Sequence, residues 1–403
     1  MLKHWLWLAE LPGLNNQERL ALLRHFGSPE DLFLADREEL GLAEGVPKGQ
    51  AELALNRDLS AADRILADCQ RLGLRVLTIQ DAEYPKRLKS IYDPPLLLYV
   101  KGRLPAFDEE AAIAVVGTRE CTPYGIASAE RLSSELAACG AVVVTGLARG
   151  VDSAAARGAL RAGGTVVGVT GNGLDLYYPY ESRSLYDDVA ATGVLISEYP
   201  PGAGADGWHF PVRNRIMAGL SVAALVVEAP VRSGALITAH LALDQGRDVY
   251  AVPGPIDAPT SAGCNRLIRD GAGLVAEGWD ILRDYEARFP EKLRPLGEAP
   301  RWTPLPTRRH SAPKAPPEPR ETPERKPQEA QTLRTVDLGG LTDDQIALLR
   351  VLETDAPAQV DDLIQATGIP ARRVLSALTM LEIDGMAGQH SGKRYTRTVT
   401  LPD

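Results

Sequence analysis

Residues 141–152 read Ala-Val-Val-Val-Thr-Gly-Leu-Ala-Arg-Gly-Val-Asp, and this stretch contains the unit from which the fold is built. The run Ala141 to Thr145 is continuously apolar and rich in β-branched residues, which is typical of a strand buried on both faces. Gly146 and Gly150 frame a turn, and Asp152 is placed to cap a helix over 153–160. A buried strand, a glycine-containing turn and a helix together form half of a β-α-β unit.

The same unit recurs along the middle of the chain. Further apolar runs occupy 113–116, 165–170, 193–197, 223–228 and 248–252, and each is followed by a helical pattern. We therefore predict a doubly wound (extended Rossmann) α/β domain over 60–290, with a parallel sheet whose ligands bind at the carboxyl ends of the strands. A helix over 61–72 and a strand over 75–79 lead into it. An apolar segment over 96–99 follows two prolines, which favours an edge position.

Residues 1–58 predict a small helical domain with short helices over 17–25, 29–35, 37–42 and 49–56. The segment Leu11-Pro12-Gly13-Leu14-Asn15 before the first of these is half of a helix-hairpin-helix pattern, in which backbone N–H groups hold a DNA phosphate. Asn15 stands where a second glycine is expected. The pattern therefore leaves two interpretations open, a DNA contact and a helical cap.

The C-terminal part begins with a predicted flexible linker over 294–337, which contains ten prolines and hardly any large apolar residue. Helices over 341–352, 359–367 and 370–384 and a hairpin over 386–400 then predict a winged-helix domain over 341–403. The basic residues placed to help a DNA reader are Arg372, Arg373, Lys393, Arg394 and Arg397. Because residues 341–403 hold six basic and nine acidic side chains, duplex DNA and a protein are equally open as partners.

Composition excludes several classes of protein. The net charge of −9 argues against a protein that coats nucleic acid indiscriminately, although a local cationic pocket remains compatible with it. No apolar run approaches the roughly 20 residues of a membrane span, and no signal peptide is indicated, so we expect a cytoplasmic protein without membrane contact. Four scattered cysteines and six histidines without ligand spacing lead us to expect no disulfide, no metal and no cofactor.

Three loops that follow strands carry the candidate chemistry. Each contains small residues and opens a helix, so together their helix N-termini can cradle a phosphate. The loops are Gly117-Thr118-Arg119, the segment from Gly146 through Arg149 and Gly150 to Asp152, and the segment from Ser233 and Gly234 to Thr238. The Gly-x-Gly-x-x-Gly fingerprint is absent from the first loop, which argues against a nicotinamide cofactor.

The segment Trp208 to Gly219 adds two arginines and an aromatic side chain. Because proline is tolerated at a helix start, Pro211 places Arg213, Asn214 and Arg215 in the first turn of a short helix, where an anion is favoured. Arg213 and Arg215 are candidates for phosphate contacts. Phe210 either stacks on a base or fills the core, and the stacking interpretation requires it to face the groove.

Two further observations bear on chemistry. No lysine occurs between Lys101 and Lys292, so arginine, whose fork suits phosphate and base, supplies the positive charge of the sheet domain. A high-GC codon bias explains this absence equally well. Asp152 and Glu228 could form a carboxylate pair for acid–base work, but Asp152 is better explained as a helix cap. The pattern shows no Ser-His-Asp or Cys-His arrangement and no Walker lysine.

In order along the chain, these motifs resemble those of the DNA-processing protein A (DprA/Smf) family. The similarity covers residues 60–285, and the helical start and winged-helix end match the three-part layout of that family. The segments that carry it are Val115 to Arg119, Thr145 to Asp152, Ser197 to Gly202, Phe210 to Ser221, Ser233 to Ala239 and Gly263 to Ile268, which includes Asn265.

The resemblance implies a single-stranded DNA-binding protein of natural transformation and recombination, without catalytic activity, which protects incoming strands and helps to load the RecA recombinase. It also implies a homodimer formed through the Rossmann domain. The residues it assigns to the DNA pocket are Arg119, Gly146, Arg149, Phe210, Arg213, Asn214 and Arg215.

Two alternatives belong to other classes. The first is a nucleotide-processing enzyme of the phosphoribohydrolase type, whose loop ends in a catalytic glutamate; here Leu241 stands three residues after Thr238, so that glutamate is missing. The second is a transcription regulator that acts through the winged helix and binds duplex DNA sequence-specifically. The first predicts release of base from nucleoside monophosphates, and the second predicts duplex binding that survives deletion of residues 111–285.

Overall fold

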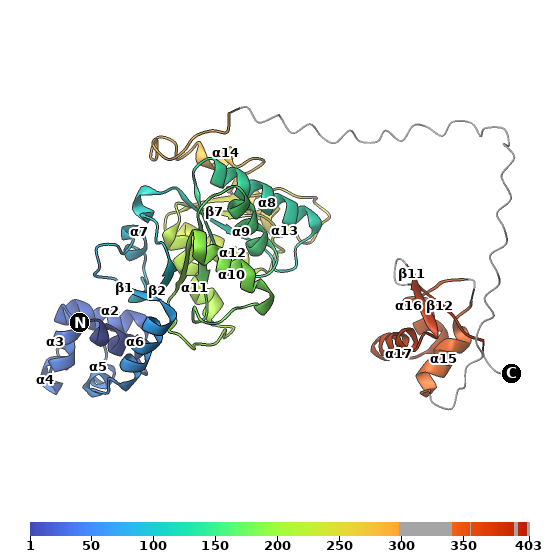
Figure 1. Cartoon of the computed structure of the whole chain (residues 1–403), viewed down its shortest axis with the longest axis horizontal. Coiled ribbons are helices and arrows are strands. Elements are labelled where there is room, and N and C mark those ends of the chain that lie inside the picture. The colour runs from blue at the N-terminus through green and yellow to red at the C-terminus, as the bar shows by residue number, and fades with distance from the viewer. Residues whose placement is uncertain (298–340, 355, 391–393, 401–403) are drawn as a thin grey trace. The chain divides into compact units, whose positions relative to one another are not determined.

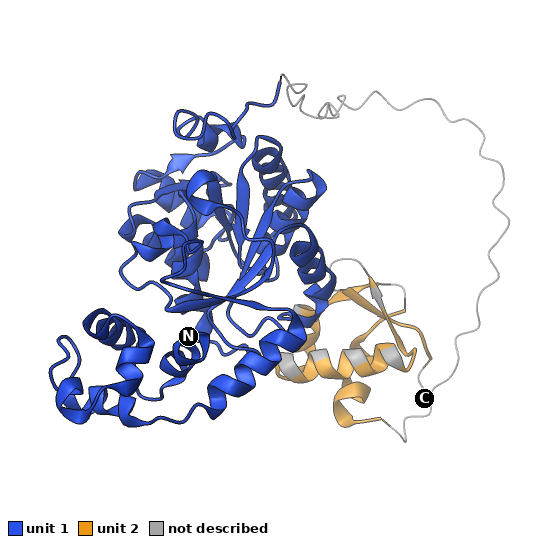
Figure 2. Ribbon diagram, turned by 60° about the vertical axis from the view of Figure 1, so that its left-hand side comes forward, with its two compact units in different colours: residues 1–303 blue, residues 304–403 orange. Residues whose placement is uncertain are grey.

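The computed structural model describes residues 1–297, 341–354, 356–390 and 394–400. The chain divides into two compact units, Met1–Thr303 and Pro304–Asp403 (Figure 2). The predicted linker over 294–337 lies almost wholly outside the described residues. The boundary that we placed near residue 59 falls inside the first unit and stays a prediction.

A mixed sheet forms the centre of the first unit, and within the described residues it has nine strands in the order β1-β2-β6-β5-β4-β3-β7-β8-β9. From β6 to β9 all neighbours are parallel, as predicted, and the order reverses at β3, which lies between β4 and β7. The strands are β1 (Arg75–Thr78), β2 (Leu97–Gly102), β3 (Ala112–Val116), β4 (Val142–Thr145), β5 (Val166–Thr170), β6 (Val194–Ser197), β7 (Ala223–Val226), β8 (Asp248–Ala251) and β9 (Gly273–Leu274).

Strand β2 corrects one prediction, because it does not lie at the edge of the sheet. It pairs antiparallel with β1 on one side and antiparallel with β6 on the other. Its first four residues are buried, so the strand is covered on both faces. The two prolines that suggested an edge, Pro94 and Pro95, precede the strand. Their missing N–H groups therefore remove no hydrogen bond from the ladder.

Helices cover both faces of the sheet (Figure 1). In succession along the chain, α8, α9 and α10 pack on one another, whereas α11 packs against α12 and α7. Right-handed crossovers run one way along the sheet from β3 to β6 and the opposite way from β7 to β9, which places these two groups of helices on opposite faces. The helices are α7 (Lys86–Lys89), α8 (Pro123–Ala138), α9 (Val151–Arg161), α10 (Arg183–Thr192), α11 (His209–Leu220), α12 (Gly234–Asp244), α13 (Ala262–Arg269) and α14 (Trp279–Leu282), with 3-10 turns η2 (Phe107–Glu109) and η3 (Tyr180–Ser182).

Short helices precede the sheet, as the sequence predicted, but the first of them was missed. Helix α1 buries Trp5, Leu6, Trp7 and Leu8 in the same hydrophobic core as the sheet, because α2, α3 and α6 pack around it. Asn15 caps α2 in a capping box with Glu18. The elements are α1 (Leu2–Glu10), α2 (Asn16–Phe26), α3 (Pro29–Leu34), α4 (Arg37–Leu40), α5 (Lys48–Ala51), η1 (Glu52–Leu55) and α6 (Ser60–Leu72).

The second unit has the predicted winged-helix plan. Its helices surround a core that includes Leu348, Leu363 and Leu378, and a small sheet in the order β10-β12-β11 completes it. Its elements are α15 (Asp343–Val351), β10 (Ala358–Gln359), α16 (Val360–Thr367), α17 (Ala371–Ile383), β11 (Ala387–His390) and β12 (Arg394–Arg397).

The basic residues of this unit are only partly available for a ligand. The guanidinium of Arg373 donates to both carboxylate oxygens of Asp344, at 2.8 and 2.7 Å, and Arg397 donates to the carbonyl of Leu349. Arg394 is exposed. Lys393 and the side chain of Arg372 lie outside what the structure describes.

Candidate functional site

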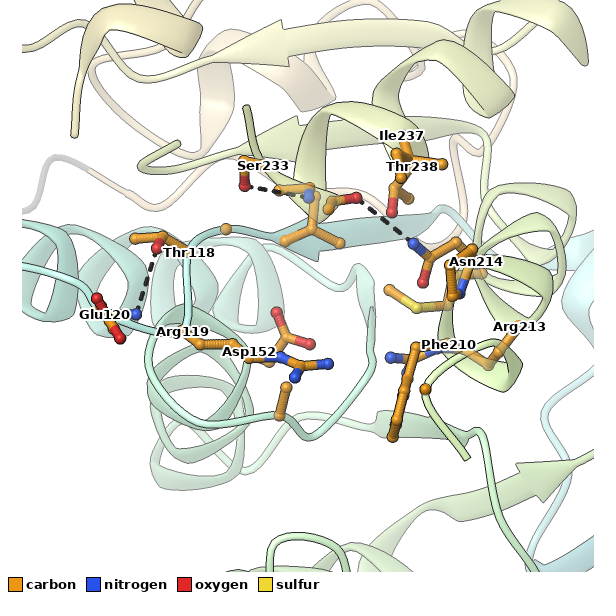
Figure 3. A pocket seen from close by; sticks show the side chains of 18 of the residues that line it. Thr118, Arg119, Glu120, Asp152, Phe210, Arg213, Asn214, Ser233, Ile237 and Thr238 are labelled. Carbon is orange, nitrogen blue, oxygen red and sulfur yellow. Dashed lines mark hydrogen bonds between the residues drawn. The ribbon is translucent and has the colours of Figure 1, made fainter. Parts of the chain in front are cut away.

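A cleft of about 570 Å³ opens at the carboxyl ends of β3 and β7, where the strand order reverses. This is the position at which open α/β sheets bind ligands. Its walls come from the loop after β3, the start of α9, the first two turns of α11 and the segment 230–238 that opens α12. Figure 3 shows side chains from all of these elements converging on one space.

The structure brings most of the predicted site residues to this cleft and places the others elsewhere. Those that line it are Gly117, Thr118, Arg119, Phe210, Arg213, Asn214, Ser233, Gly234 and Thr238. Those that do not line it are Gly146, Arg149, Gly150, Arg215 and Asn265.

Phe210 lines the cleft instead of the core. Its ring is half-buried, and the guanidinium carbon of Arg119 lies 5.0 Å from the ring centroid (Figure 3). Gly171 lies close behind the ring, since a Cβ built there would be 3.2 Å from Phe210 Cδ1. This placement meets the condition for base stacking, although stacking itself stays a prediction.

Helix α11 begins earlier than the sequence predicted. Its first residue is His209, so Pro211 is the third residue of the helix, and Arg213 and Asn214 lie in the second turn. Proline is tolerated there because the N–H groups of the first turn have no partner within the helix. His209 fixes this start: its Nδ1 lies 2.9 Å from the carbonyl of Gly171, and its ring stacks on Tyr199. The first-turn placement of the two arginines was therefore wrong.

Arg213 is a buried charge at the base of the cleft. It is 4% exposed, and its Nη1 donates to the carbonyl of Val169. Gly146 makes room for it, because a Cβ at that position would lie within 2.1 Å of Nη1. Burial lowers the pKa of Arg213, and Asp152 acts in the opposite direction. Gly146 thus contributes by admitting Arg213 rather than by contacting a ligand.

Asp152 also lines the cleft, but it is not a helix cap. Helix α9 begins at Val151 after Gly150, which serves as N-cap without a side-chain hydrogen bond, so Asp152 belongs to the first turn. Burial raises the pKa of its carboxyl group, while Arg213 and Arg119 oppose that rise. The carboxylate is therefore an acidic group beside the two arginines, and our interpretation of it as a cap was wrong.

Glu228 is held away from this cleft by its own partners, so the two carboxylates form no pair. Its side chain accepts hydrogen bonds from the backbone N–H and the hydroxyl of Thr122, at 2.9 and 2.8 Å. Its backbone carbonyl accepts from the N–H of Thr118 at 2.7 Å. Glu228 therefore fixes the loop that carries Arg119.

Gly150 acts through the same loop. Its φ is +78°, and a Cβ there would lie 2.4 Å from the carbonyl oxygen of Thr118. Only glycine lets α9 begin this close to the Arg119 loop. The neighbouring Arg149 is exposed and pairs with Glu181 at 2.8 Å.

Arg215 differs most from its predicted role. Its guanidinium pairs with Glu198, at 2.7 and 2.8 Å, and with Asp93 at 2.9 Å, and the side chain is 9% exposed. Burial lowers its pKa, but Glu198 and Asp93 raise it by more, so the net shift is upward. Residues two apart on a helix point about 200° apart, so Arg213 and Arg215 cannot face the same ligand. The structure therefore places Arg215 outside the cleft, and its predicted phosphate contact finds no support in this geometry.

Asn265 likewise has a structural partner. Its side-chain amide donates to the carbonyl of Gly254 at 3.0 Å and accepts from the N–H of the same residue at 3.1 Å. This pair of bonds ties α13 to the segment after β8. It leaves the residue outside the cleft.

Sequence reasoning missed two exposed residues of the cleft, Arg232 and Tyr178. Arg232 directly precedes the predicted loop at Ser233, so its position was a usable signal. Tyr178 follows β5 in a segment without a recognised motif. Among the described residues, no carboxylate forms an ion pair with Arg119 or Arg232, so two exposed cations at the cleft are available to an anion.

Other kinds of site find no support in the part of the chain that the structure describes. No group of three or more His, Cys, Asp or Glu side chains there could hold a metal ion. The four cysteines are all free. None of the helices described has the length and apolar character needed to span a membrane.

The fold and the cleft define a class: a doubly wound α/β protein with an arginine-lined cleft at the switch point of its sheet and a separate winged-helix domain. Comparison with known proteins narrows the class. The family model described as DNA recombination-mediator protein A matches residues 75–286, and the model of the DprA winged helix domain matches residues 312–393. The chain belongs to the DNA recombination-mediator protein A family, and the resemblance seen in its sequence is confirmed.

Individual relatives agree with this assignment. Protein Smf of Synechocystis is 32% identical over 98% of both chains. The DNA processing protein DprA of Streptococcus pneumoniae is 44% identical over 52% of this chain and 73% of its own. The X-ray structure of DprA from Streptococcus pneumoniae superposes with a TM-score of 0.63 and 36% identity, over 70% of this chain and 98% of that one.

Proposed function

We propose that this chain binds single-stranded DNA in the cleft at the carboxyl ends of β3 and β7 and acts in the cytoplasm during natural transformation and recombination. In this role it protects incoming single strands and helps to load the RecA recombinase. The observation that carries the proposal is the exposed, unpaired guanidinium of Arg119 beside the ring of Phe210 in a cleft of about 570 Å³.

The chemistry of the cleft suits a single strand. Arg119 and Arg232 supply charge for phosphate, and the small residues Ser233 and Gly234 line the cleft at the start of α12, where the positive end of the helix dipole favours an anion. Phe210 offers a ring for a base. In a duplex the faces of each base are covered by their neighbours, whereas a single strand presents phosphate and an open base together. The proposal therefore predicts a preference for single strands.

Titration of a labelled single-stranded oligonucleotide and its matching duplex across salt concentrations tests the proposal. Each phosphate contact to a single strand adds about −0.7 to the slope of log affinity against log salt. Arg119→Ala is expected to reduce this slope, whereas Arg161→Ala, which removes an exposed arginine that is paired with Glu130 outside the cleft, serves as the control. A slope near zero, or a preference for duplex, contradicts the proposal.

Four parts of the proposal need tests of their own. Loading of RecA predicts faster recombinase assembly on a protein-coated single strand when the chain is added. A homodimer formed through the Rossmann domain predicts twice the monomer mass in sedimentation, retained after deletion of residues 341–403. Action by binding alone predicts that no base is released from nucleoside monophosphates.

Contact of the winged helix with duplex DNA or a protein predicts that the full chain binds that partner and that deletion of residues 341–403 removes the binding.

A further inference from the structure

We propose that Tyr178 and Phe210 form a two-ring stacking platform, and that Tyr178 is a base-contacting residue of the cleft. The inference rests on the proposed binding of single-stranded DNA and adds a residue and a mode of contact to it. It starts from one juxtaposition: the two ring centroids lie 5.3 Å apart with an angle of 33° between the ring planes, and both rings line the cleft.

The neighbouring tyrosines show that this orientation is specific to Tyr178. Tyr177 packs edge-on against the buried Tyr186, with ring centroids 5.7 Å apart, and its hydroxyl donates to Asp187. Tyr180 is 70% exposed but does not line the cleft. Tyr178 is 42% exposed and lines the cleft, so part of the residue's surface is open there. An aromatic ring left open beside a cation is suited to a flat, apolar ligand surface such as a base.

The backbone around Tyr178 is fixed before any ligand arrives. The hydroxyl of Tyr186 donates to the carbonyl of Tyr178 at 2.8 Å, and the side chain of Asn172 donates to the carbonyl of Leu176 at 2.9 Å. The backbone that carries Phe210 is also held, because the buried side chain of the preceding residue, His209, contacts the carbonyl of Gly171 at the start of α11. Both rings therefore project from supported backbone, which reduces the ordering cost of binding.

Arg119 adds a positive charge beside the two rings, so that the same site can contact a phosphate as well as a base. Its guanidinium lies 5.0 Å from the centroid of Phe210, so a strand whose base reaches the platform brings the adjacent phosphate close to that guanidinium (Figure 3). Charge and ring surface then contact the same nucleotide unit. Because every base has a π-face, this arrangement holds a strand without regard to its sequence.

Binding of oligothymidylate and of an abasic oligonucleotide of equal length to the full chain tests the inference. Tyr178→Ala is expected to weaken oligothymidylate binding about 5- to 150-fold, the range that corresponds to roughly 1–3 kcal/mol of stacking at about 1.4 kcal/mol per tenfold. Tyr178→Phe keeps the ring and is expected to stay within about twofold of the unmodified chain, in line with stacking that depends on the ring alone. The abasic strand is expected to bind the unmodified chain and Tyr178→Ala equally.

The matched control is Tyr180→Ala, which removes a more exposed tyrosine two residues away and is expected to change neither affinity. An unchanged affinity of Tyr178→Ala for oligothymidylate overturns the inference, as does an equal loss on the abasic strand, because such a loss reports a structural role. If the unmodified chain instead shows no salt-dependent binding of single strands, the proposed function fails. A normal salt slope without a Tyr178 effect contradicts only the platform.

Discussion

Helix α11 carries an arginine on each of two faces, and the two faces have different roles. One face presents Phe210 and Arg213 to the cleft, and the other presents Arg215 to Asp93 and Glu198. Asp93 in turn accepts hydrogen bonds from Asn16 and Gln17 at the start of α2. The second face therefore joins the helix to the N-terminal helices, while the first forms the candidate site. Arginines two residues apart in one motif thus need not share a function.

Arg215→Ala gives the largest expected effect on this comparison. It removes the shared partner of two carboxylates at a buried position, and such losses cost about 3–5 kcal/mol because the remaining charges stay uncompensated. We expect a drop of that size in the free energy of unfolding, measured by denaturant titration. A variant that folds with normal stability but loses DNA affinity would show that Arg215 binds the ligand after all.

Gly146→Ala tests the cleft face at its base. The added Cβ falls within 2.1 Å of Arg213 Nη1, so the guanidinium must move or the backbone must shift. Overpacking of this kind costs roughly 1–3 kcal/mol. We expect lower stability together with weaker single-strand binding. Gly49→Ala is the control for the loss of a glycine, since a Cβ there meets nothing within 4 Å and the backbone does not adopt a positive φ. Unchanged stability and binding in Gly146→Ala would contradict the close contact.

Arg119→Ala separates binding from stability. The side chain is exposed and forms no ion pair with the described residues, so the free energy of unfolding is expected to change by no more than about 0.5 kcal/mol. Single-strand affinity is expected to fall about tenfold, and the salt slope by about 0.7. This is the reverse of the pattern expected for Arg215→Ala. If Arg119→Ala and Arg215→Ala lowered the free energy of unfolding equally, the distinction between a binding role and a structural role would be contradicted.

Asp152→Asn gives the smallest expected effect and depends on pH. Burial raises the pKa of this carboxyl group in the folded state, so its protonated form favours folding. That contribution is complete below the unfolded pKa, near 3.9, and is lost as the pH rises through the folded value. The stability of Asp152→Asn relative to the unmodified chain is therefore expected to increase between pH 4 and 7. At pH 7 the variant is also expected to bind single strands a few-fold more tightly, because it removes a negative charge from the cleft.

Urea titrations of Asp152→Asn and the unmodified chain at several pH values measure the stability difference, and binding assays in parallel measure the affinity for single strands. A stability difference between Asp152→Asn and the unmodified chain that is constant from pH 4 to 7 would mean that the carboxyl group has an ordinary pKa. A weaker affinity of the variant for single strands would mean that the carboxylate contacts the strand favourably.

Much of the fold could be predicted because the parallel strands are continuously apolar. All six predicted core runs became strands β3 to β8, with ends that differ by no more than two residues. The three strand-end loops were predicted for the same reason, since a strand of known direction places its following loop at a known edge. Helix α1 and the position of β2 were harder, because their burial depends on contacts with distant segments.

The sequence by itself determined the doubly wound sheet, the edge at which the cleft lies and the family to which the chain belongs, because these follow from local patterns and their order. The tertiary structure alone decided which arginines of the motif reach the cleft, that Gly146 serves Arg213, and that Tyr178 lies beside Phe210. The physical reason is that helix phase and long-range ion pairs select the orientation of each side chain. The partners of Arg215, 122 and 17 residues away, leave no signal near it in the chain.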